Sequence, residues 1–99
     1  MKNINNYNND IEEAYNSLIK TAQEAKDNGD FEHAISAFKA ALEFKPKQIQ
    51  VMGELCWTYG QVDKYEEMLE TAKKALLISQ KRISKDNIGR FYFYISTYY

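Results

Sequence analysis

The stretch KDNGDFEHAISAFKAALEFKP, Lys26 to Pro46, decides the fold that this sequence predicts. Gly29 can adopt the left-handed backbone conformation that ends a helix, and Asp30 offers a side-chain oxygen that caps the next one. From Phe31 the apolar residues recur three and four positions apart, which is the spacing of one helical face, until the proline stops the helix. The stretch therefore predicts a tight turn followed by an amphipathic helix, and it contains almost no reactive group.

The residues upstream predict a partner for this helix. Apolar residues from Ile11 to Ala25 also fall three and four positions apart, so the two segments should form an antiparallel hairpin. Residues 1–10 contain five asparagines and no apolar pattern, and we predict a disordered lead-in there.

The pattern repeats downstream at an offset of 34 residues. This offset superposes Phe31 on Tyr65, Ala41 on Ala75 and Leu42 on Leu76. It predicts further helices at residues 49–61 and from residue 64 to about residue 83. A helix–turn–helix unit at a fixed period of about 34 residues is typical of an α-solenoid, because one unit cannot bury its own apolar face and stacks on the next.

The predicted fold is all-α: a right-handed α-solenoid of two full helix–turn–helix repeats plus a half. Repeat one covers residues 11–46, and repeat two covers residues 47–84 with an extended second helix. Residues 87–99 supply the first helix of a truncated third repeat. Their aromatic composition also suits a strand; we favour a helix because the repeat requires one there.

Composition argues against several classes of protein. The longest apolar run is far shorter than the roughly 20 residues that cross a bilayer, and the N-terminus lacks the apolar core of a signal peptide. The single cysteine cannot form an intramolecular disulfide, and no zinc-ligand spacing is present. A net charge of −1 gives no general attraction to nucleic acid. We expect an intracellular protein of the cytoplasm or nucleus that needs no metal or cofactor and binds neither membrane nor nucleic acid.

The reactive side chains do not form a catalytic constellation. His33, the single histidine, has no serine or cysteine at a spacing that indicates nucleophilic catalysis. Cys56 occupies a small-residue position between two helices, which favours a buried, inert thiol. Glu66, Glu67 and Glu70 indicate a solvated helix face. We therefore predict that the protein is not an enzyme.

These residues resemble the tetratricopeptide repeat, whose consensus combines small, aromatic and leucine positions with a turn glycine and a closing proline. The first unit supplies Ala22, Gly29, Asp30, Phe31, Ala34, Phe38, Ala41, Leu42 and Pro46. The second unit supplies Leu55, Cys56, Tyr59, Tyr65, Ala72, Ala75 and Leu76. It departs from the consensus with Asp63 at the turn glycine, Met68 at an alanine and Gln80 at the proline. The resemblance implies that the matching residues pack the helices and repeats together.

A narrower resemblance lies within the first. KYEEMLETAKKALL, residues 64–77, followed by YIST, residues 94–97, is similar to the N-terminal helical repeats of COP9 signalosome subunit two and of a related proteasome lid subunit, both of the PCI family. This resemblance implies a fragment of a non-catalytic protein–protein interaction scaffold, within a multi-subunit complex, that contacts cullin–RING ligases. The alternative is a free-standing tetratricopeptide adaptor that binds an extended peptide in its concave groove.

Two surfaces are candidates for partner binding. The family's first helices line the concave surface, which places Trp57 and Gln61 there beside Gly53 and Gly60, although Trp57 equally suits packing against the next repeat. The second candidate is a basic series that suits a solvated face, with an acidic partner or a polyanion as the alternative: Lys73, Lys74, Lys81, Arg82, Lys85 and Arg90. Under the signalosome resemblance the charge contacts are Lys26, Lys73, Lys74, Lys81 and Arg82, with Trp57 as an anchor.

The end of the chain predicts self-association. If residues 87–99 form a helix, its apolar face has no second helix of its repeat to cover it. That face consists of Ile88, Phe91, Phe93, Ile95, Tyr98 and Tyr99. Uncovered apolar patches tend to bind a second copy of a chain.

Overall fold

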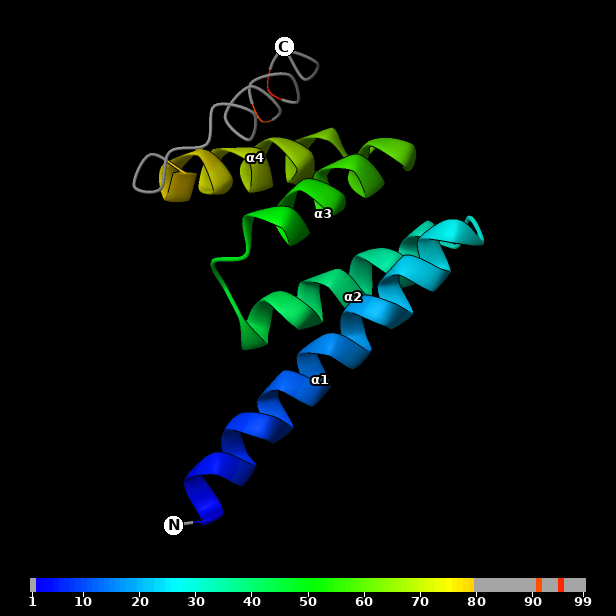
Figure 1. Cartoon of the computed structure of the whole chain (residues 1–99). Coiled ribbons are helices and arrows are strands. Elements are labelled where there is room, and N and C mark those ends of the chain that lie inside the picture. Colours follow the sequence, from blue (N-terminus) through cyan, green and yellow to red (C-terminus); the bar gives the residue numbers. More distant parts are fainter. Residues whose placement is uncertain (1, 80–90, 92–94, 96–99) are drawn as a thin grey trace. The chain divides into compact units, whose positions relative to one another are not determined.

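Helices make up most of the described part of the chain. The computed structural model describes residues 2–79, 91 and 95, and it contains no strand within these residues. The helices are α1 (Lys2–Asp27), α2 (Phe31–Phe44), α3 (Ile49–Gln61) and α4 (Tyr65–Ser79), as Figure 1 shows. Phe91 and Ile95 are helical as well.

The chain divides into two compact units, Met1–Pro46 and Lys47–Tyr99. In the first unit α1 packs on α2, and in the second unit α3 packs on α4. Each unit therefore contains one helix–turn–helix hairpin (Figure 1). The predicted all-α class, built from helix–turn–helix repeats, is confirmed.

The core of the first hairpin follows from the apolar stripe of α2. Phe38 is fully buried, and so is Ala22 on the facing helix α1. The buried residues of α2 are Ala34, Ile35, Ala37, Phe38 and Ala41. Because three of these five are alanines, the backbones of α1 and α2 can lie close together while a single large ring fills the space between them.

The first turn closes α1 with two backbone hydrogen bonds. The N–H of Gly29 donates to the carbonyl of Lys26 at 3.0 Å, and the N–H of Asp30 donates to the carbonyl of Ala25 at 2.8 Å. This is a Schellman motif, and Gly29 provides its left-handed residue with φ of 79°. The carboxylate of Asp30 then accepts a hydrogen bond from the N–H of His33 at 3.4 Å, which caps α2.

The second hairpin turns in the same way without a glycine. Asp63, 34 residues after Gly29, has φ of 61°. Its N–H donates to the carbonyl of Gly60 at 3.4 Å, and the N–H of Lys64 donates to the carbonyl of Tyr59 at 3.0 Å. The replacement of the consensus glycine therefore leaves the turn intact, because aspartate is among the few residues that tolerate this conformation.

The core of the second hairpin has its large side chain at a different position from that of the first. Ala34 and Phe38 of the first hairpin correspond to Met68 and Ala72, so the large side chain has moved by one helical turn. Met68 is 2% exposed and Ala72 is fully buried. The thiol of Cys56 lies beside them and donates to the carbonyl of Met68 at 3.5 Å. The exchange of a large and a small residue keeps the hairpin filled, which explains why the methionine is accommodated.

The N-terminal segment differs from the prediction. Residues 2–10 belong to α1 and are not a disordered lead-in. A helix that is already nucleated and packed downstream propagates into its neighbours at little cost, which the local composition alone did not indicate. The extension of α4 to about residue 83 lies outside the described residues, and so does the third-repeat segment 87–99 apart from Phe91 and Ile95.

For Phe91, the structure differs from the uncovered apolar face predicted at the end of the chain. Its side chain is 0% exposed, so it belongs to a packed interior. Ile95 is half-buried. The other members of that predicted face, Ile88, Phe93, Tyr98 and Tyr99, lie outside the described residues.

Membrane insertion finds no support in the described helices. None of them combines the length and the apolar composition that a bilayer-crossing helix requires.

Candidate protein-binding surface

One stripe of α3 faces outward in the second unit. Gln50, Trp57 and Gln61 are exposed, and Glu54 between them is half-buried. Their spacings of four, three and four residues place them along one side of the helix. Trp57 is 40% exposed, which is unusual for the largest apolar side chain of a small protein. We call Gln50, Glu54, Trp57 and Gln61 the α3 stripe.

The two glycines of α3 lie elsewhere than predicted. Gly53 is buried, and a Cβ atom added at Gly60 would lie 3.7 Å from the sulfur of Met68 on α4. Both glycines therefore belong to the packed side of the helix. They therefore do not extend the exposed surface around Trp57.

The predicted charge contacts are divided between the two units. Lys26 is half-buried in the last turn of α1, in the first unit. Lys73 and Lys74 are exposed on α4, in the second unit. The remaining members of the basic series, Lys81, Arg82, Lys85 and Arg90, lie outside the described residues.

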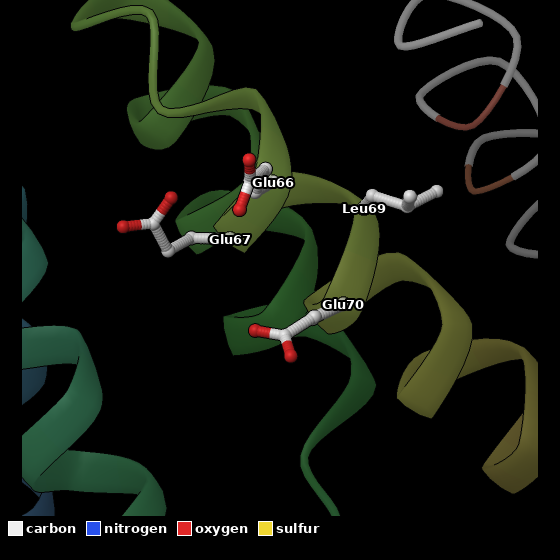
Figure 2. Close-up of a pocket in the computed structure, with 4 residues that line it drawn as sticks. All are labelled: Glu66, Glu67, Leu69 and Glu70. Atoms are coloured by element: carbon white, nitrogen blue, oxygen red, sulfur yellow. The ribbon is translucent and has the colours of Figure 1, made fainter.

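An acidic hollow lies at the beginning of α4. Glu66, Glu67, Leu69 and Glu70 line an open depression of the surface (Figure 2). The carboxylates of Glu67 and Glu70 project on the same side of the helix, as Figure 2 shows. Burial raises the pKa of the Tyr59 hydroxyl, and the charges of Glu67 and Glu70 raise it further. The carboxylates therefore set a negative potential on this side of the second unit.

The reactive side chains have structural roles. Nδ1 of His33 lies 2.5 Å from a carboxylate oxygen of Asp30, and this hydrogen bond is the main cause that lowers the pKa of the Asp30 carboxyl. Cys56 is fully buried. Within the described residues no group of three or more His, Cys, Asp or Glu side chains could hold a metal ion.

A cluster that the sequence did not indicate ties α1 to the end of α2. The ammonium of Lys45 pairs with the carboxylate of Glu12 and lies 4.5 Å from the centroid of the Tyr15 ring. Burial raises the pKa of the Tyr15 hydroxyl, while the charge of Lys45 lowers it and that of Glu12 raises it. The partners are 33 residues apart, so no local pattern could have identified the contact.

Most of the predicted repeat-packing residues are buried or half-buried, and three are exposed. The buried ones are Ala22, Ala34, Phe38, Ala41, Leu55, Cys56, Tyr59, Ala72 and Ala75, and the half-buried ones are Phe31, Leu42 and Leu76. Gly29 and Pro46 are exposed at the turns. Tyr65 departs from its predicted packing role: it is 41% exposed, and its hydroxyl donates to the carboxylate of Asp63 at 2.8 Å.

Comparison with known proteins finds a family match in the first hairpin. Residues 15–48 match the family model of the tetratricopeptide repeat. Neither the curated proteins nor the solved structures contain a match to this chain. The family match and the hairpin geometry together support a tetratricopeptide-type helical repeat, a unit that typically serves in protein–protein interaction. The narrower resemblance to the signalosome and proteasome lid subunits has no support among these matches.

Proposed function

We propose that this chain is a non-catalytic scaffold that binds another protein through the α3 stripe. The observation that carries the proposal is the exposure of Trp57 on a helix whose other large apolar residues are buried or half-buried. Exposed tryptophans are enriched among the residues that dominate binding energy at protein interfaces.

The chemistry of the α3 stripe suits an extended peptide. Gln50 and Gln61 flank the indole of Trp57 along the helix, and each amide can both donate to and accept from a peptide backbone. The indole offers a large flat surface for an apolar side chain of the peptide. The expected partner is therefore a peptide segment with a large apolar residue and exposed main-chain groups, as in the tetratricopeptide adaptor hypothesis.

A second candidate function is the charge-led contact with a cullin–RING ligase that the signalosome resemblance implies. The exposure of Lys73 and Lys74 favours it, since neither ammonium makes an ion pair within the described residues. Lys26, Lys81 and Arg82 would complete the contact under that hypothesis. Binding of this kind weakens steeply with salt because exposed charges are screened.

A selection from a displayed random-peptide library tests the first candidate. We expect that Trp57→Ala weakens the binding of the selected peptides by more than about tenfold, since interface tryptophans often contribute about 2 kcal/mol or more to binding. The matched control is Tyr65→Ala, because Tyr65 is an aromatic residue of nearly equal exposure on the same unit. Equal losses in the two variants, or none in either, would contradict the proposal.

The second candidate is tested with a purified cullin–RING ligase. It requires that Lys73→Glu with Lys74→Glu abolishes binding while Trp57→Ala has little effect. Binding that is insensitive both to salt and to charge reversal would exclude it.

A further inference from the structure

The outer face of α4 carries two blocks of opposite charge. The first block is Glu66, Glu67 and Glu70, and the second, one turn further on, is Lys73 and Lys74. All five residues are exposed. Leu77 follows on the same face and is 65% exposed, the most exposed of the large apolar residues described. We call these six residues the α4 face.

The charges of the α4 face do not neutralise one another within the helix. Glu70 precedes Lys73 and Lys74 by three and four residues, a spacing that allows intrahelical ion pairs. Within the described residues none of the five charged side chains makes an ion pair or a hydrogen bond. The three glutamates instead line the open depression shown in Figure 2. Both blocks are therefore available to an outside partner.

We propose that the partner of the α4 face is a second copy of the same chain. A helix with an acidic first half and a basic second half is complementary to itself when two copies lie antiparallel, which is the arrangement of a two-fold symmetric interface. The antiparallel arrangement also opposes the two helix dipoles, which is favourable. This inference is independent of the proposed peptide-binding function.

The register of the pair follows from the positions on the helix. A two-fold axis near Thr71 brings Glu67 of one copy to Lys74 of the other, and Glu70 to Lys73 of the other. At 3.6 residues per turn the two members of each pair lie on the same side of the α4 face. The same register sets Leu77 against the methylene groups of Glu66 in the other copy. Symmetry repeats each contact, so the interface has four ion pairs with an apolar contact at each end.

The strength of such an interface depends on ionic strength. Exposed ion pairs are individually weak and are screened by salt, so the dimer forms reversibly at high protein concentration. Sedimentation velocity should show association that rises with concentration at about 0.01 M ionic strength, where the Debye length is about 30 Å, and a monomer at about 1 M, where it is about 3 Å. A monomer at every concentration in low salt would overturn the proposal.

Charge reversal provides the decisive experiment. One variant carries Glu67→Lys and Glu70→Lys, and the other carries Lys73→Glu and Lys74→Glu. In each variant alone, both members of every predicted ion pair carry the same charge, so each variant alone should be monomeric. An equal mixture of the two should form a heterodimer about as tightly as the original chain dimerises. Association of either variant alone, or no association in the mixture, would contradict the antiparallel pairing.

Two controls separate this interface from other surfaces. Reversal of charges on α2, by Lys39→Glu with Glu43→Lys, alters exposed residues of the first unit and should leave dimerisation unchanged. Trp57→Ala should also leave it unchanged, although it removes the proposed peptide anchor. Far-UV circular dichroism of every variant establishes that the helices are retained.

Discussion

Positions 29 and 63 place different residues in the same left-handed turn conformation. A Cβ atom at Gly29 would meet no atom within 4 Å, so Gly29→Ala tests the backbone alone. We expect it to lower the free energy of unfolding by about 1–2 kcal/mol, the cost of this conformation for a residue with a side chain. Asp63→Ala should cost less, because the chain already carries part of that cost with aspartate at this position. Urea denaturation of the full chain measures both; equal losses would show that the two turns are not equivalent.

The cap at Asp30 makes the first hairpin sensitive to acid. The pKa of this carboxyl is lowered in the folded chain, chiefly by the hydrogen bond from His33. The ionised form therefore contributes stability above the unfolded pKa of about 3.9, and that contribution is lost as the pH falls through the lower folded pKa.

Asp30→Asn tests this acid sensitivity because asparagine also caps helices but carries no charge. The original chain should be more stable than the variant at about pH 6, and the difference should vanish at about pH 2. Urea denaturation across this range measures it. A difference that does not change with pH would show that the carboxylate charge plays no part.

Among the elements, α1 and the end of α2 are joined by the contact between Tyr15 and Lys45. The ring and the ammonium lie 4.5 Å apart, within the range of a cation–π interaction. A double-mutant cycle with Tyr15→Leu and Lys45→Gln should yield a coupling energy of about 0.5–1 kcal/mol. The control pair Tyr15→Leu and Lys39→Gln should give a coupling near zero. If both cycles give the same coupling energy, the coupling arises from the net charge of the chain and not from the contact between Tyr15 and Lys45.

The elements also show how far sequence reasoning reaches. The bounds of α2 follow from an Asp-Phe start and a proline just after its end, which are local signals, and the helix agrees with them. The large core residue lies at a different repeat position in each hairpin, Phe38 in the first and Met68 in the second, and this difference was not predicted. The comparison with a consensus considers each position by itself, so it does not detect that two positions have exchanged a large and a small residue. The burial of Gly53 was also missed, because Gly53 lies only about 40° around the helix from the exposed Trp57, and the packed side of α3 begins between them.

The candidate surface could be predicted only in part from the sequence, for the same reason. The repeat pattern placed Trp57 and Gln61 on one helix side, and both are exposed in the structure. The companion residues Gln50 and Glu54 became visible only when the burial of the rest of α3 was known. The Lys45 cluster joins residues distant in sequence, so it depends on the completed hairpin.

At the scale of the whole molecule, the second unit includes residues beyond its hairpin. Phe91 lies in the unit Lys47–Tyr99, and its side chain is completely buried although α4 ends at Ser79. A large aromatic side chain without solvent contact stabilises a core by burying apolar area. The interior of the second unit therefore includes Phe91, which the repeat pattern assigned to a separate repeat.

Phe91→Ala tests this contribution to the core. We expect a loss of about 3–5 kcal/mol in the free energy of unfolding, the usual cost of emptying a buried phenylalanine site. The matched control is Phe44→Ala, because Phe44 is 45% exposed and its removal leaves no enclosed cavity. If chemical denaturation shows that the two substitutions cost the same, Phe91 does not serve as a core residue.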